Sequence, residues 1–126
     1  MKSLQLGEME TKFAEIIWEN EPIPSGELAR ICSEKLHWSR TTMYTVLRRL
    51  CAKGIFINER GIVTSLQSKE NVTALRSEQF IIDNFNGSLP SFFAAFTQQR
   101  KLTEEEYWEI SRMIDEAVQA RKEKDE

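Results

Sequence analysis

Residues that bind metals or form disulfides are scarce in this sequence. It contains two cysteines, Cys32 and Cys51, and one histidine, His37, and it has no CxxC motif. A structural zinc site needs four such ligands, usually in closely spaced pairs. We therefore expect no metal site and no cofactor, and we interpret both cysteines as small apolar residues on the flanks of helices.

Long apolar runs are also absent. No run approaches the ~18 residues that a membrane-spanning helix requires. The segment from Met1 to Gly7 lacks the apolar centre of a signal peptide. These absences predict a cytoplasmic protein without membrane insertion. A length of 126 residues suits one medium domain, or a compact domain followed by an oligomerisation segment.

Motifs that indicate catalysis are missing as well. The chain has no glycine-rich phosphate loop, no paired-carboxylate motif in a cleft-forming context, and no nucleophile in a recognisable arrangement with His37. We expect that the protein is not an enzyme. The enzyme alternative would need a site built from unremarkable residues, which a hydrolase or transferase screen would test.

Positive charge is concentrated in one stretch, although the whole chain has a net charge of −3. Residues 35–60 hold one acid, Glu59, and six bases, which give +5 (six minus one). The bases are Lys35, Arg40, Arg48, Arg49, Lys53 and Arg60. From residue 71 onward, seven bases and eleven acids give −4 (seven minus eleven). A local basic patch in an acidic chain indicates a confined contact with DNA.

The basic stretch contains a strongly patterned helix. Ser39 is a good N-cap, because its hydroxyl accepts a hydrogen bond from an unpaired amide of the first turn. Gly54 stands where a helix ends in a left-handed residue. Between them an apolar stripe recurs at helical spacing and predicts one buried face. This apolar stripe consists of Met43, Val46, Leu47 and Leu50.

The opposite face of this helix carries no acid. It consists of Thr41, Thr45, Arg48 and Ala52, with Tyr44 and Arg49 at its two sides. Arginine binds guanine or phosphate in a fork, and threonine offers a hydroxyl and a methyl group to base edges. The pattern favours a recognition helix for the major groove. A solvated helix face with ordinary surface charges is the alternative.

Two further helices precede the basic one. We expect the first from about Gly7 to Asn20, and a break at the prolines of the segment 21–24. Ser25 is expected to cap a second helix that runs to about Leu36, before a short turn at His37 and Trp38. A helix, a short turn and a basic helix follow one another in the helix-turn-helix motif.

An extended segment follows Gly54. Two β-branched runs, residues 55–57 and 62–66, flank a four-residue turn at 58–61 and predict a hairpin. Three helices and a hairpin give a winged helix with Arg60 at the tip of the wing. A hairpin that only closes the core is the alternative. We therefore predict a mainly α fold with a small β-hairpin, in which a winged helix-turn-helix precedes a helical segment.

The rest of the chain is predicted to be helical and unusually apolar. We expect helices from Lys69 to about Asn84, after the cap Ser88, and after the capping box Thr103–Glu106. So many apolar residues after a complete winged helix predict a dimer interface. An intramolecular three-helix cap is the alternative. The expected interface residues are Phe80, Phe85, Leu89, Phe92, Phe93, Phe96, Tyr107, Ile110 and Ile114.

These segments resemble the penicillinase-repressor family. Residues 38–50, followed by Lys53 and Gly54, resemble its recognition helix, as residues 15–18 resemble its first helix. Residues 80–89 and 101–106 resemble its dimerisation segment. The resemblance covers residues 6–120 and implies a homodimeric winged-helix repressor that binds palindromic operators, typically with TACA and TGTA cores. It divides the chain into a DNA-binding domain, 1–68, and a dimerisation domain, 69–126.

The resemblance also implies a mode of inactivation. In β-lactam resistance systems of this family, an antibiotic-sensing membrane metalloprotease triggers cleavage of the repressor in its dimerisation segment. The corresponding bond here would be Ala95–Phe96, with alanine where well-known members have asparagine. The copper-responsive branch of the family has a cysteine-rich C-terminal motif that this chain lacks, so no copper sensing is expected.

The expected DNA contacts come from the recognition helix and the wing. Three residues at the helix N-terminus would face the phosphate backbone, which helix amides favour. These are Ser39, Arg40 and Thr41. Base and phosphate contacts would be divided among Thr42, Tyr44, Thr45, Arg48 and Arg49, with Arg60 at the wing. The alternative from another class is a winged helix that binds a protein partner and does not read DNA.

Overall fold

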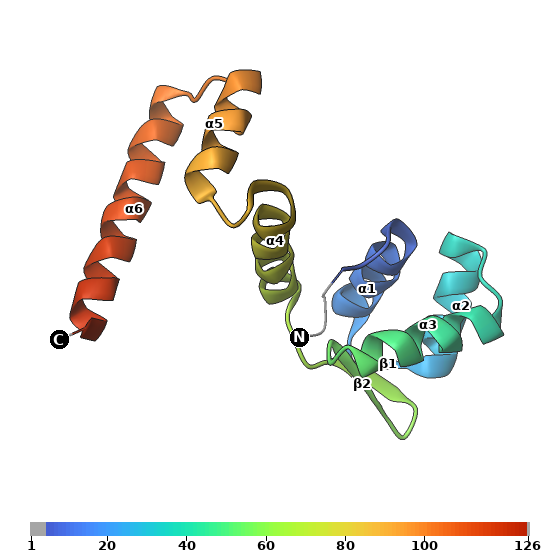
Figure 1. The fold of residues 1–126 in the computed structure, drawn as a ribbon. Coiled ribbons are helices and arrows are strands. Elements are labelled where there is room, and N and C mark those ends of the chain that lie inside the picture. The colour runs from blue at the N-terminus through green and yellow to red at the C-terminus, as the bar shows by residue number, and fades with distance from the viewer. Residues whose placement is uncertain (1–4, 126) are drawn as a thin grey trace. The chain divides into compact units, whose positions relative to one another are not determined.

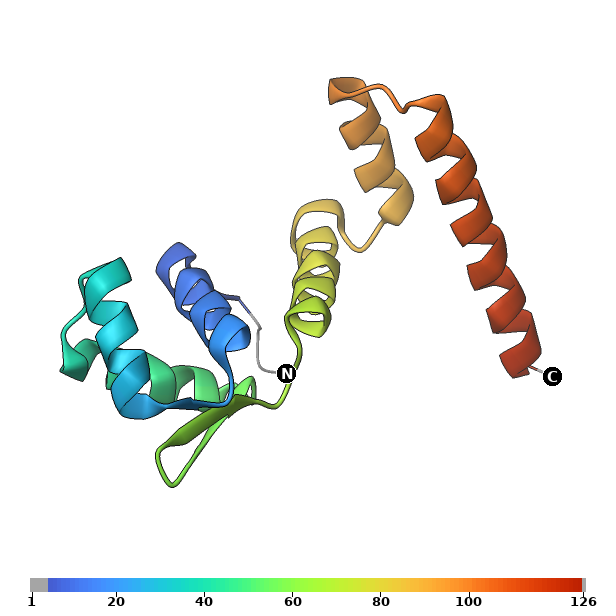
Figure 2. The same cartoon turned by 180° about the vertical axis from the view of Figure 1, so that it is seen from behind.

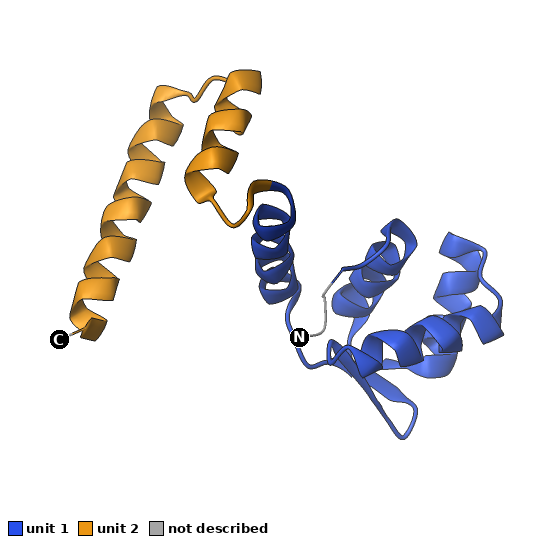
Figure 3. Ribbon diagram, viewed as in Figure 1, with its two compact units in different colours: residues 1–84 blue, residues 85–126 orange. Residues whose placement is uncertain are grey.

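The computed structural model describes residues 5–125. Residues 1–4, on which part of the expectation about the N-terminal segment rests, lie outside the described residues, as does Glu126. The chain divides into two compact units, Met1–Asn84 and Phe85–Glu126 (Figure 3). Within the described part, no helix is both long and apolar enough to cross a membrane. The functional boundary between residues 68 and 69 stays a prediction.

Three helices open the first unit (Figure 1): α1 (Glu8–Asn20), α2 (Ser25–Leu36) and α3 (Arg40–Ala52). The carboxylate of Glu10 accepts a hydrogen bond from the N–H of Gly7, so it satisfies an amide at the start of α1. Pro24 is the N-cap of α2 and Ser25 is its first helical residue. Our assignment of Ser25 as the cap is therefore wrong by one position.

A small antiparallel sheet completes the winged helix. It contains β1 (Ile23–Pro24), β2 (Phe56–Glu59) and β3 (Ile62–Ser65), in the order β1-β3-β2. The predicted hairpin is confirmed, but its turn is two residues shorter than expected, because Asn58 and Glu59 pair with β3. The sequence did not predict β1, since a strand of two residues shows no alternating pattern.

The core of the first unit lies between α1, α2, α3 and the sheet, and Val72 of α4 (Lys69–Phe85) reaches it. All four residues of the apolar stripe of α3 are buried, as predicted. Phe13 of α1 and Phe56 of β2 are the largest fully buried side chains. Because one side of α3 packs into this core, the opposite side is left outside, with the hairpin beside it (Figure 2).

The second unit contains α5 (Leu89–Gln99) and α6 (Glu104–Asp125). Ser88 caps α5 by accepting the N–H of Ser91, as expected. The predicted capping box of α6 is also present: Thr103 accepts the N–H of Glu106, and the Glu106 carboxylate accepts the N–H of Thr103. The predicted fold class, a winged helix followed by a helical segment, is confirmed.

The packing of α3 gives a stability prediction. Leu50→Ala removes a fully buried side chain, so we expect the free energy of unfolding to fall by about 2–5 kcal/mol. Urea denaturation followed by circular dichroism measures this change. Ile62→Ala on β3 is the control, because Ile62 is 42% exposed and its truncation should cost less than about 1 kcal/mol. Similar losses in the two variants would contradict the placement of the core.

Candidate nucleic-acid interface

The N-terminus of α3 is open and carries no acid in its first turn. The Ser39 hydroxyl oxygen accepts the N–H of Thr42 at 3.1 Å and lies 3.0 Å from the Thr42 hydroxyl. Arg40 and Thr41 follow the cap and are exposed. The remaining amides of the first turn give this end of the helix a partial positive charge, which favours a phosphate group.

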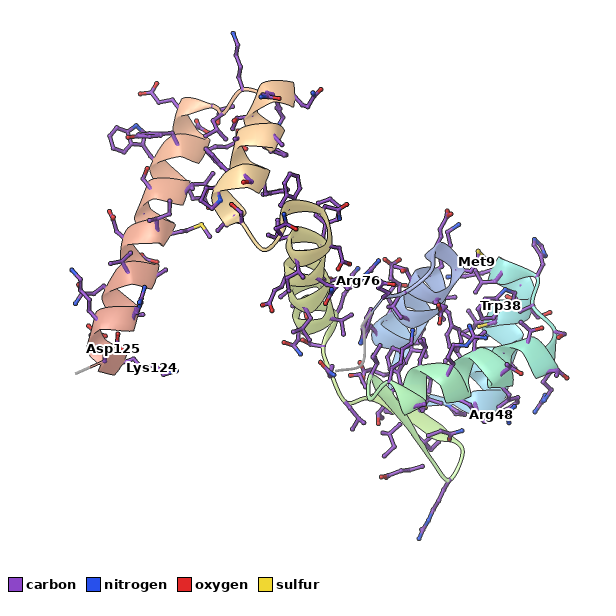
Figure 4. The ribbon with its side chains drawn as sticks, in the orientation of Figure 1. Met9, Trp38, Arg48, Arg76, Lys124 and Asp125 are labelled. Carbon is purple, nitrogen blue, oxygen red and sulfur yellow. The ribbon has the colours of Figure 1, made fainter. Side chains whose placement is uncertain are left out.

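The outer face of α3, which we define as Thr41, Thr45, Arg48 and Ala52, is exposed along its whole length. The Thr45 hydroxyl donates to the carbonyl of Thr41 at 2.9 Å, which fixes the orientation of its side chain. Arg48 projects from α3 on the side turned away from Met9 of α1 (Figure 4). Within the described residues, Arg48 makes no ion pair and no cation–π contact. Its guanidinium group is therefore available to an external acceptor.

Tyr44 ties α3 to its neighbours. Its hydroxyl donates to the Ser25 hydroxyl at 2.9 Å, and the N–H of Ser25 donates to the carbonyl of Gly61 at 2.7 Å. The Arg40 guanidinium lies 5.9 Å from the centre of the Tyr44 ring. Ser25 thus joins α3, the start of α2 and the turn of the hairpin. Sequence reasoning gave Ser25 only a local capping role, because nothing local signals a contact with residues 44 and 61.

The wing ends in a tight two-residue turn. Arg60 and Gly61 have φ angles of 53° and 82°, the left-handed conformation that two-residue hairpin loops require. Glycine adopts this conformation without strain, but a residue with a side chain, such as Arg60, is strained in it. The turn leaves the Arg60 side chain exposed to solvent. The predicted position of Arg60 at the wing tip therefore agrees with the hairpin geometry, and its contact with DNA stays a prediction.

Arg49 points to a different part of the first unit. Its Nη1 lies 3.5 Å from a carboxylate oxygen of Glu10 in α1. Lys53, the C-cap of α3, lies 4.0 Å from the same oxygen. Both bases counted toward the positive charge of residues 35–60, yet both face an acid that is distant in the sequence. The structure thus separates Arg49 from the outer face that holds Arg48.

The cysteines offer no obvious reactive group. Burial raises the pKa of the Cys32 thiol to about 11. Burial also raises the pKa of Cys51, although a backbone hydrogen bond from Asn58 opposes the shift. A thiol with a raised pKa is a poor nucleophile and a poor metal ligand at neutral pH. Within residues 5–125, no three potential metal ligands gather at one place.

The second unit presents a separate apolar surface. None of its described residues is fully buried. A groove between α5 and α6, which we call the C-terminal groove, is lined by Leu89, Pro90, Phe92, Phe93, Leu102, Tyr107, Ile110, Ser111 and Ile114. Six of the nine predicted interface residues line this groove. Phe85 and Phe96 adjoin it, with ring centres 5.6 and 6.0 Å from that of Phe92. Phe80 lies on α4 in the first unit.

The Ala95–Phe96 bond lies inside α5. The carbonyl of Phe96 accepts the N–H of Arg100 at 3.1 Å, and the Arg100 guanidinium lies 5.2 Å from the centre of the Phe96 ring. Arg100 also pairs with both carboxylate oxygens of Glu106, at 3.0 and 2.7 Å, and this contact lowers the pKa of Glu106 to about 2. The bond is therefore held in helical conformation between two capped ends.

Comparison with known proteins gives two matches. The family model described as penicillinase repressor matches residues 6–116, a range that begins before α1 and ends within α6. The chain is also similar to the penicillinase repressor of Bacillus licheniformis, with 25% identity over 123 residues. The aligned region covers 94% of this chain and 96% of that protein. Both matches therefore include α3 and the C-terminal groove.

The hydrogen bonds around Ser25 can be tested by a double-mutant cycle. Tyr44→Phe and Ser25→Ala each remove one partner of the same hydrogen bond, so each should lower the free energy of unfolding by about 0.5–1.5 kcal/mol. Because the bond can be lost only once, the double variant should cost clearly less than the sum of the two single variants. Urea unfolding of the four proteins provides the cycle. Strictly additive losses would show that Tyr44 and Ser25 act independently.

Proposed function

The chain belongs to the penicillinase repressor family, and on this premise we propose that it represses transcription as a homodimer bound to a palindromic operator. Membership makes it a DNA-binding repressor of transcription. The further steps concern how the chain reads DNA, what joins two copies, and how repression ends.

The exposed outer face of α3, which carries no acid, is the observation that carries the proposal for DNA reading. Burial of the apolar stripe turns Thr41, Thr45 and Arg48 outward, and Arg48 has no competing partner among the described residues. A helix of this kind enters the major groove and places its side chains against base edges. The open N-terminus of α3, with Ser39, Arg40, Thr41 and Thr42, would meet the adjoining phosphates.

The wing supports the same orientation. The hydrogen bonds from Tyr44 through Ser25 to Gly61 hold the hairpin turn at a fixed position next to α3. When α3 occupies the major groove, Arg60 at the tip would reach the flanking backbone. One exposed arginine at the tip supplies a single charged contact, so we expect the wing to add a small share of the affinity and of its salt dependence.

A second copy of the chain is the proposed occupant of the C-terminal groove. The second unit has no fully buried residue in its described part, while Leu89, Phe93 and Ile114 are 64, 44 and 57% exposed. A pair of helices with this composition leaves more apolar surface in water than a stable monomer normally does. Two copies related by a twofold axis would cover the same surface on each other.

Dimerisation would set the length of the operator. Two recognition helices related by a twofold axis enter successive major grooves about 34 Å apart. Each half binds weakly alone, and coupling the halves makes the second binding event intramolecular and multiplies the affinity. The palindromic operator with two equal half-sites follows from this symmetry.

The similarity to a penicillinase repressor supports a target among β-lactam-resistance-type genes. We further propose that a sensor metalloprotease triggers the release of repression, as the family resemblance of the sequence implies. Cleavage at Ala95–Phe96 would cut α5, which forms one wall of the C-terminal groove. Because this bond lies within a capped helix, α5 would have to open locally before a protease could bind it. Cleavage would then separate the two halves and release DNA.

Arg48→Ala tests the proposed reading of DNA. Truncation removes the unpaired guanidinium of the outer face and should weaken binding to an operator selected from random sequences by about 1–3 kcal/mol, roughly 5- to 150-fold. Fluorescence anisotropy measures the affinity. Arg112→Ala on α6 is the control: Arg112 forms an ion pair with Glu116 of the same helix, and its truncation should leave the affinity unchanged. Equal affinity of the Arg48 variant and the unmodified protein would refute the assignment of α3.

Phe93→Glu tests the proposed dimer. The substitution places a charge in the C-terminal groove, and we expect sedimentation velocity to show monomers at concentrations where the unmodified protein is dimeric. Trp108→Glu is the matched control: Trp108 is 63% exposed, also lies in the second unit, and does not line the groove. A dimer that survives Phe93→Glu, or one that only Trp108→Glu disrupts, would place the interface elsewhere.

A further inference from the structure

Glu10 of α1 faces two of the bases of the recognition helix. From this contact we infer that Arg49 and Lys53 position α3 within its own unit and do not bind DNA, because Glu10 occupies both. The inference rests on the proposed function, since it concerns which charges of α3 reach the operator. It assigns Glu10 a role in limiting the DNA contacts of the protein.

Glu10 is held in place by its own helix. It is the third residue of α1, and its Oε1 accepts the N–H of Gly7 at 3.1 Å. The positive end of the helix dipole favours a carboxylate at this position. The side chain is only 18% exposed, and its Oε2 is buried without a hydrogen-bond donor among the described groups. An oxygen in that position depends on nearby positive charge.

Arg49 and Lys53 supply this positive charge. They are one helical turn apart on α3, and their nitrogens lie 3.5 and 4.0 Å from Oε2 of Glu10. Lys53 has an additional contact: its Nζ donates to the carbonyl of Gln5 at 2.8 Å, and its side chain is only 23% exposed. Lys53 is therefore fixed to the segment that leads into α1, whereas Arg49, whose side chain is 53% exposed, is held by its ion pair with Glu10 in α1.

Four of the six bases between residues 35 and 60 are then left for DNA: Lys35, Arg40, Arg48 and Arg60. A phosphate that approached Arg49 would have to compete with the Glu10 carboxylate, which is already in place and partly shielded from water. Only contacts that replace counterions on DNA contribute to the salt dependence of binding, by about 0.9 in the slope of log K against log salt for each phosphate. Arg49 should contribute nothing to this slope while Glu10 is charged.

The slope of log K against log salt distinguishes a residue that binds DNA from one that only positions α3. A variant that is merely less stable still binds the same number of phosphates, so its slope does not change. We would measure this slope with a selected operator for the unmodified protein, Arg49→Gln, Glu10→Gln and the double variant Glu10→Gln/Arg49→Gln. Arg112→Gln, which removes a paired arginine from α6, is the matched control. Lys53→Gln repeats the test at the second base, in case Arg49→Gln folds poorly.

We expect Arg49→Gln and Lys53→Gln to keep the slope of the unmodified protein. Glu10→Gln should steepen it by about 0.9 or more, as freed bases meet phosphates, and adding Arg49→Gln should reverse about 0.9 of that gain. A slope that Arg49→Gln alone flattens by about 0.9, or one that Glu10→Gln leaves unchanged, would overturn the inference while DNA binding stands. Absence of salt-dependent binding by the unmodified protein would overturn the proposed function and, with it, this inference.

Discussion

The apolar stripe of α3 and the core into which it packs fix the rotation of this helix about its own axis. Every residue of the stripe is buried, so the helix cannot turn without exposing at least one large side chain, at a cost of about 1.5–3 kcal/mol for each. The outer face is thereby held toward solvent. The hydrogen bonds through Ser25 then place the wing relative to that face. A rigid first unit supplies the geometry that sequence-specific recognition requires.

The two units differ in how much of their apolar surface they bury. The first unit buries a continuous core that extends from Leu6 to Val72, whereas the described part of the second unit has no fully buried residue. Such a segment gains stability when a partner surface covers it. We propose that association of two copies covers the C-terminal groove and, in the same step, joins two DNA-binding units. Repression would then be controlled through the second unit.

Local patterns predicted most of the fold. The stripe of α3, the caps at Ser39, Ser88 and Thr103, and the hairpin all depend on residues a few positions apart. Sequence reasoning missed β1 and the bridging role of Ser25, because both arise from contacts between residues that are distant in the sequence. Ile23 pairs with Val63, a separation of 40, and Ser25 contacts Tyr44 and Gly61, separations of 19 and 36. Sequence reasoning also missed the contact between Arg49 and Glu10, because no local pattern connects these two residues.

Footprinting of the purified protein on DNA upstream of its own gene, repeated across salt concentrations, tests whether two copies bind one operator together. A dimeric repressor should protect one palindrome whose two half-sites lie one helical turn, or a multiple of it, apart and lose protection together as salt increases. Random-site selection supplies the DNA if the operator lies elsewhere. Protection of a single, non-palindromic half-site, or no protection of selected DNA even at low salt, would contradict a dimeric operator-binding repressor.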